Sequence, residues 1–168
     1  MNVKQIYTSC LSQAAYFIES DGVSAVIDPL RDVDRYIKLA EKYKSKIKYV
    51  FETHFHADFV SGHLTLAKKT KAKIVFGPES DPNYDAIICK ENQVFKIGKL
   101  SLTAIHTPGH TLESTSYLLF DENGKQKCLF TGDTFFLGDV GIPDVAQRYK
   151  GVSKEELAGI LYDSINKK

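Results

Sequence analysis

Three side chains that commonly bind metal ions lie within five residues of one another, at His54, His56 and Asp58. They follow the β-branched and aromatic segment 47–51, which we expect to form a buried strand. Ligands on a loop at the carboxyl end of a strand are held by a rigid base, where α/β proteins tend to bind ligands. Imidazole and carboxylate groups in this pattern indicate a transition-metal site.

Two further candidate ligands, His110 and Asp133, occur later in the chain, each after an apolar segment typical of a strand. Taken alone, a histidine is more often structural than a ligand, and Asp133 in Thr-Gly-Asp could simply form a turn. The ordered set of three strand-end loops favours a metal site over these structural explanations.

The elements expected around these loops alternate between strands and helices. The predicted strands are 3–7, 14–19, 24–27, 47–51, 73–76, 93–97, 100–105, 114–120 and 127–130. The predicted helices run from a cap at Asp32 or Asp34 to about residue 44, from about 61 to 69, and from a capping-box pattern at Ser153. This order predicts an antiparallel meander first and mixed sheets with helices packed outside them.

The composition indicates one domain of ordinary globular character. The chain has 168 residues, a mass of 18.8 kDa and a net charge of +1, which gives no reason to expect nucleic acid or an anionic membrane as a partner. Apolar stretches are shorter than the about 18 residues of a membrane span, and the first residues lack the apolar block of a signal peptide. Three cysteines without paired spacing favour reduced thiols in a cytoplasmic protein.

The motifs that carry the candidate ligands resemble those of the metallo-β-lactamase superfamily. They are segment 53–58, Thr-Pro-Gly-His-Thr at 107–111 and Thr-Gly-Asp-Thr at 131–134, in that family's order and rough spacing. The resemblance covers nearly the whole chain and implies an αββα sandwich with a metal site between its two sheets. Family members continue beyond the last helix expected here. The resemblance therefore implies that the single domain, 1–168, lacks the carboxyl-terminal part of the fold, and an exposed edge there favours a homodimer.

Within the superfamily, HADFVSG at 56–62 and GDVGIPD at 138–144 resemble the persulfide dioxygenase branch, including members fused to rhodanese domains. That branch implies one Fe(II) held by the catalytic residues His54, His110 and Asp133, with His56 and Asp58 orienting the ligands. It implies oxidation of a low-molecular-weight thiol persulfide, such as glutathione persulfide, to sulfite with O2. A rhodanese domain or partner would then transfer the sulfur. Ile142 departs from the branch, which usually has arginine there, and a basic group near the pocket mouth is thereby lost.

The first alternative is a zinc-dependent hydrolase, such as a thioesterase like glyoxalase II, and the second is a non-catalytic metal-binding module. The hydrolases typically hold two zinc ions and need a histidine after the first-motif aspartate, where this chain has Phe59. They also use a late histidine, and none follows His110 here. The missing ligands favour a mononuclear site, in which zinc could replace iron and His56 or Asp58 could serve as alternative ligands.

The remaining histidines and cysteines receive structural interpretations. His63 is expected to face solvent and His106 to be packed. Cys89 and Cys128 are expected to be buried. Cys10 is either a small core residue or a residue that lines the substrate pocket.

Overall fold

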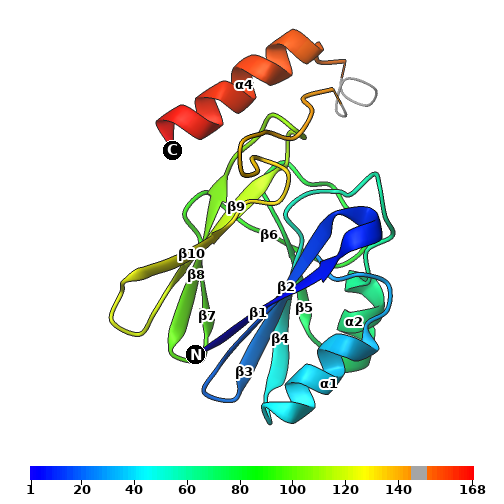
Figure 1. Cartoon of the computed structure of the whole chain (residues 1–168), viewed down its shortest axis with the longest axis vertical. Helices are drawn as coiled ribbons and strands as arrows, with labels where there is room; N and C mark the ends of the chain where they lie inside the picture. Colours follow the sequence, from blue (N-terminus) through cyan, green and yellow to red (C-terminus); the bar gives the residue numbers. More distant parts are fainter. Residues whose placement is uncertain (145–150) are drawn as a thin grey trace.

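Two β-sheets face each other across an apolar core, with helices outside the larger sheet (Figure 1). The computed structural model describes residues 1–144 and 151–168. The strands are β1 Asn2–Thr8, β2 Gln13–Ser20, β3 Val23–Ile27, β4 Lys46–Phe51, β5 Lys73–Phe76, β6 Ile87–Ile88, β7 Val94–Ile97, β8 Leu100–His106, β9 Thr115–Phe120 and β10 Gln126–Phe130. The helices are the short 3-10 turn η1 Ser9–Leu11, α1 Asp34–Lys42, α2 His63–Thr70 and α4 Lys154–Lys167.

The first sheet has the order β1-β2-β3-β4-β5-β6 and changes character in its middle. Strands β1, β2 and β3 form the predicted antiparallel meander, whereas β3, β4, β5 and β6 pair in parallel. Parallel neighbours need a crossover, and α1 and α2 supply it. The buried side chains of Tyr36 and Leu66 on these helices pack with Val26 and Val50 of the sheet. Because β3 and β4 are parallel, Asp28 and the loop after Phe51 emerge at the same edge.

The second sheet has the order β10-β9-β8-β7 and is antiparallel throughout. Its two hairpins are those predicted from the sequence. Alternate side chains of β8 and β9, such as Leu102 and Tyr117, join Ile18 and Phe51 of the first sheet in a fully buried cluster. This cluster is the layer between the sheets, and it holds the strand ends that carry the candidate ligands in fixed positions.

Helix α4 packs against the loop that carries His110. Its predicted capping box is present, since the Ser153 hydroxyl accepts from the backbone N–H of Glu156, whose side chain returns to Ser153 N. The Ser164 hydroxyl donates to the carbonyl of Pro108 at 2.7 Å. A Cβ on Gly109 would collide with Leu161, so this residue allows the helix to approach the loop closely.

Two details of the fold differ from the sequence prediction. Helix α1 begins after Val33, without a side-chain cap from Asp32 or Asp34. Asp34 lies instead in the first turn, where its negative charge interacts favourably with the positive end of the helix dipole. Its carboxylate also pairs with the Lys69 ammonium at 2.8 Å. The segment before residue 91, which has no clear pattern, supplies the edge strand β6. In the part of the chain that the structure describes, no helix is long and apolar enough to cross a membrane.

Candidate metal centre

His54, His110 and Asp133 converge from three separate loops. One ligand atom from each lies within 4.8 Å of the others. The Asp133 Oδ2 atom is 3.9 Å from Nε2 of His54 and 3.7 Å from Nε2 of His110. The two imidazole rings are nearly perpendicular, with centroids 4.9 Å apart. The predicted ligand set is therefore assembled in space.

The His54 ring is fixed by a hydrogen-bond chain that begins at Asp28. The Thr53 hydroxyl donates to Asp28 Oδ2 at 2.8 Å, which uses its single proton. The Thr53 hydroxyl oxygen also lies 3.0 Å from His54 Nδ1. Because its proton is already used, it must accept a hydrogen bond from Nδ1. Nδ1 therefore carries the ring proton and Nε2 presents a lone pair to the centre. Burial lowers the pKa of His54 well below its usual range, with smaller effects from His56 and His110, so the ring is neutral as a ligand must be.

The His110 ring is oriented in the same way by a backbone carbonyl. Its Nδ1 atom lies 2.9 Å from the oxygen of Ile142, which can only accept a hydrogen bond. Nε2 of His110 is therefore also free of a proton in the neutral ring. The chain can turn here because residue 141 is glycine. A Cβ at that position would collide with the carbonyl of Asp133 and come within 2.9 Å of His110 Nδ1.

Asp133 is the most exposed of the three groups, with 38% of its side chain accessible. Gly132 before it has a φ of +50°, and a Cβ there would collide with Thr53. Burial raises the pKa of Asp133, while the charges of His110 and His56 oppose the rise. Two lone pairs and a carboxylate oxygen face one another in this space, which is unfavourable unless a cation or proton lies between them. Two imidazoles and one carboxylate suit zinc or Fe(II).

His56 does not join this group but turns toward two buried carboxylates. Its Nε2 atom is 3.1 Å from Asp28 Oδ1 and 3.7 Å from Glu52 Oε2, and these three groups form a second cluster of potential ligands. Burial opposes the charged form of His56, but Asp28 and Glu52 outweigh it and raise its pKa to about 9. Burial also raises the pKa of Glu52 well above its usual range, with His56 opposing.

His63 was expected to face solvent, and this expectation is wrong. Only 13% of its side chain is exposed. Nε2 lies 2.7 Å from the Tyr84 hydroxyl and Nδ1 lies 3.7 Å from Glu52 Oε1. Burial lowers the pKa of His63 to about 4, and the charge of His56 adds to this effect. The helix face that carries His63 points at the buried carboxylate of Glu52, a tertiary contact that helical periodicity does not reveal.

The other expected residues lie as follows. Asp58 is exposed, and its charge contributes to the raised pKa of Asp133. Cys10 is exposed on η1, so its interpretation as a small core residue is wrong, and its role in substrate binding stays a prediction. Cys89 is buried as expected, whereas Cys128 is wrongly predicted and is only partly buried. His106 is packed as expected, with Nε2 2.8 Å from the Leu112 carbonyl.

Sequence reasoning missed the groups that orient the ligands. Neither Asp28 nor Glu52 was singled out as a functional residue, and the Ile142 carbonyl has no sequence signal. Asp28 and Glu52 do carry a signal, since each is an acidic residue directly after an apolar strand at the edge that holds the ligands.

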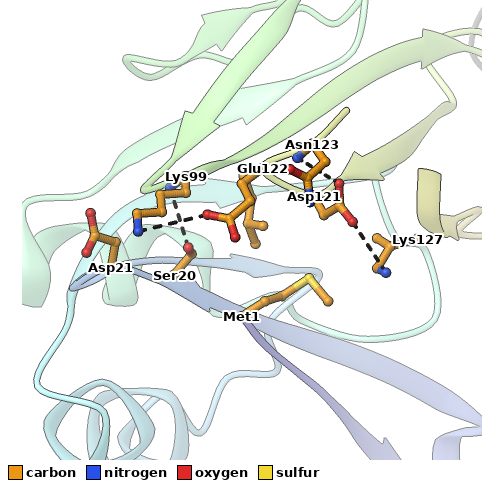
Figure 2. A pocket seen from close by; sticks show the side chains of 9 residues that line it. Met1, Ser20, Asp21, Lys99, Asp121, Glu122, Asn123 and Lys127 are labelled. Carbon is orange, nitrogen blue, oxygen red and sulfur yellow. Dashed lines mark hydrogen bonds and ion pairs between the residues drawn. The ribbon is translucent and has the colours of Figure 1, made fainter. Parts of the chain in front are cut away.

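A separate polar pocket of about 370 Å³ lies at the opposite end of the sheets (Figure 2). Ser20 and Asp21, just before β3, lie on its wall with Lys99. Its charged groups neutralise one another, since Lys99 pairs with Glu122 at 3.9 Å and Lys127 with Asp121 at 3.4 Å. The candidate metal ligands do not line this pocket.

Comparison with known proteins gives consistent matches. Residues 8–86 match the family model of the metallo-beta-lactamase superfamily. The chain is 33% identical over 144 residues to the cytoplasmic hydroxyacylglutathione hydrolase of Arabidopsis thaliana, covering 83% of this chain and 55% of that protein. It is 34% identical over 155 residues to the hydroxyacylglutathione hydrolase of Dictyostelium discoideum, covering 89% and 54%. The chain thus spans about half the length of the curated relatives it matches.

Two solved structures resemble nearly the whole chain. A metallo-beta-lactamase from Staphylococcus aureus superposes with a TM-score of 0.90 and 38% identity, over 99% of this chain and 51% of that one. ETHE1 from Myxococcus xanthus superposes with a TM-score of 0.82 and 27% identity, over 98% of this chain and 68% of that one.

Proposed function

The chain belongs to the metallo-β-lactamase superfamily, and from this membership we propose that it is a metal-dependent enzyme whose single ion is bound by His54, His110 and Asp133. The fold predicted from the sequence is confirmed, and the chain covers 51% of the Staphylococcus aureus structure and 68% of ETHE1. The convergence of the three ligand atoms within 4.8 Å is the observation that carries the metal centre. Zinc and iron are the ions that the ligand types suit.

Hydrolysis of a thioester is the first candidate reaction. The two curated relatives described above are both named hydroxyacylglutathione hydrolases, and this supports the hydrolase alternative better than the dioxygenase that the sequence motifs favoured. When bound, the ion would supply Lewis-acid activation of water and of the thioester carbonyl. The partly exposed Asp133 would face the incoming substrate. Asp58 is exposed and its charge acts on Asp133, so its carboxylate would be the candidate group to accept a proton from the attacking water.

Oxidation of a thiol persulfide is the second candidate, and one specific observation favours it. His56 is engaged by Asp28 and Glu52, so two histidines and one carboxylate remain for the ion. This is the ligand set of non-haem Fe(II) oxygenases, which leaves positions open for substrate and dioxygen. With iron bound, the ion would supply the redox chemistry. The overall reaction consumes RSSH, dioxygen and water and releases RSH and sulfite. ETHE1 is a persulfide dioxygenase, and the structural likeness of this chain to it supports the same reaction.

One pair of assays distinguishes the two reactions. The purified chain is loaded anaerobically with Zn(II) or Fe(II). Each form is then assayed for hydrolysis of a hydroxyacylglutathione thioester and for dioxygen uptake with glutathione persulfide. Thioester hydrolysis by the zinc form supports the first candidate, and persulfide-dependent dioxygen uptake by the iron form supports the second. Bound metal without either activity would leave a metal-binding module and reject both.

The ligand assignment is tested with a matched pair of histidine variants. His110→Ala is expected to lose the ion and the activity. His106→Ala removes a histidine four residues earlier, whose Nε2 lies 2.8 Å from the Leu112 carbonyl, and should retain both. Retained metal in His110→Ala, measured by elemental analysis, would remove this residue from the ligand set.

A further inference from the structure

We infer that Glu52 determines how many protein ligands the ion receives, because its buried carboxylate keeps the imidazole of His56 out of the metal centre. Glu52 is thus a positioning residue that acts through His56. The inference rests on the proposed metal centre, but it does not depend on whether the reaction is hydrolysis or oxidation.

The position of His56 between the two carboxylates is the observation behind this inference. Its side chain is only 6% exposed, and its Nε2 atom faces Asp28 Oδ1 at 3.1 Å and Glu52 Oε2 at 3.7 Å. The Glu52 side chain is itself held in place, because its Oε1 accepts a hydrogen bond of 2.8 Å from the Ser61 hydroxyl. The ring is therefore directed at two carboxylates.

His56 nevertheless lies beside the metal centre. Its ring centroid is 4.2 Å from that of His54, two residues earlier on the same loop. A rotation of the side chain would bring a ring nitrogen toward the space shared by His54 and Asp133. The ring of Phe59 packs against His56 at 4.3 Å and supports its present orientation through apolar contact. Distance alone does not keep His56 from binding the ion.

The two carboxylates are not equivalent in this restraint. Asp28 also accepts from Thr53 N at 2.7 Å and from the Thr53 hydroxyl at 2.8 Å, so it supports His54 as well as His56. The Glu52 side chain has no such link to the three proposed ligands in the described part of the chain. Its ionic partners there are His56 and His63. Removing the Glu52 carboxylate should therefore weaken the restraint on His56, which Asp28 Oδ1 alone would then face at 3.1 Å, and leave the support of His54 intact.

The burial of Glu52 indicates that its carboxylate has a functional role. The side chain is 2% exposed, and burying a carboxylate is costly unless it is paired and hydrogen-bonded. An apolar side chain of similar volume at such a site is often neutral or stabilising. A glutamate at this position, whose nearest ion-pair partners are histidines, is better explained by control of His56 than by stability.

Release of His56 would change the chemistry of the centre. Two imidazoles and one carboxylate leave several positions open, as a dioxygenase requires. A third imidazole would fill one of them, giving a fourth protein ligand, and four protein ligands are typical of closed zinc sites. By keeping His56 away from the ion, Glu52 would leave open the positions at which both reactants bind.

The experiment counts the bound histidines with Co(II) as the probe. Wild-type protein, Glu52→Met and Glu52→Met/His56→Ala are loaded with Co(II), and the hyperfine-shifted exchangeable imidazole protons are counted by proton NMR. In the wild type, the Nδ1 protons of His54 and His110 should give two such signals. Glu52→Met should give a third and bind zinc about tenfold more tightly. The double variant should return to two signals.

A matched control removes a buried carboxylate that contacts the same loop from the neighbouring β8–β9 loop. Glu113 is 9% exposed, and its Oε1 accepts from the backbone N–H of Phe55 at 3.1 Å, without a histidine in the interaction. Glu113→Met should keep the two wild-type signals. Glu52→Ala serves as the second variant if Glu52→Met does not fold, as judged by circular dichroism.

The possible outcomes separate this inference from the proposed function. A folded Glu52 variant with two signals and unchanged zinc affinity would overturn the role of Glu52, while the metal centre would stand. A third signal that persists in the double variant would also overturn it, because the new ligand would not be His56. A wild-type chain that binds no Co(II) would overturn the metal centre and this inference together.

Discussion

The backbone carbonyl of Ile142 accepts a hydrogen bond from Nδ1 of His110, with 2.9 Å between the two atoms. This contact orients a proposed metal ligand without using the Ile142 side chain, which is 67% exposed. Persulfide dioxygenases usually have arginine at this position. Because the backbone carbonyl orients His110, the side chain here can change without loss of that support.

Ile142→Arg is expected to leave metal content unchanged and to lower KM for an anionic glutathione derivative by a few-fold, because an exposed charge pair contributes up to about 1 kcal/mol. Elemental analysis and steady-state kinetics check both parts. Ile142→Ala is the control and should match the wild type in metal content. Loss of metal in either variant would contradict the backbone role of this residue.

Thr53→Val is expected to weaken metal binding by about 10- to 100-fold, the usual effect of removing a group that orients a ligand. The valine methyl cannot accept the Nδ1 proton of His54, which the hydroxyl accepts at 3.0 Å. Thr53→Ser keeps the hydroxyl and is the matched control. Competition with a chromophoric chelator measures the affinities, and equal values for the two variants would show that the hydroxyl has no such role.

The His63 side chain should make folding sensitive to acid. Its pKa is lowered to about 4 in the folded chain, below the value near 6.5 expected when unfolded. The unfolded state then binds more protons between these values, so the stability that His63 contributes is complete above pH 6.5 and declines as the pH falls toward 4. The loss relative to His63→Gln should reach up to about 3 kcal/mol. Urea unfolding of the metal-free proteins at pH 7, 5.5 and 4.5 measures it, and parallel pH profiles would contradict it.

The cysteines should differ in reactivity. Burial raises the pKa of Cys89 to about 11, and thiolates are the reactive form, so Cys89 should resist alkylation in the native protein. Cys10 is exposed and should react first. Peptide mass mapping after iodoacetamide treatment gives the order. Protection of Cys10 by a bound substrate analogue would support its predicted place in the pocket, and unchanged labelling would argue against it.

The difference between what the sequence predicted and what it missed follows from the range of the interactions. Strands such as 47–51 and the capping box at Ser153 are local patterns, so the sequence reveals them. The predicted ligands His54, His110 and Asp133 each follow a strand, and the resemblance of their motifs to those of the family singled them out. The contacts of His56 with Asp28 and of His63 with Glu52 depend on which way a side chain turns in the folded protein. No periodicity in the sequence encodes that direction, and for the same reason the Ile142 carbonyl could not be predicted.

Gly109→Ala should detach α4 from the loop that carries His110. Gly109 has a φ of +142°, which is strained for other residues, and a Cβ there would collide with the backbone of Leu161. We expect a loss of about 2–4 kcal/mol in the free energy of unfolding and weaker metal binding, because His110 is the next residue. Gly159→Ala is the control, since no atom lies within 4 Å of its Cβ in the interior of α4, and it should stabilise the chain by about 0.5–1 kcal/mol. Denaturant unfolding compares the two. Equal stability of Gly109→Ala and the wild type would mean that α4 does not depend on this close contact.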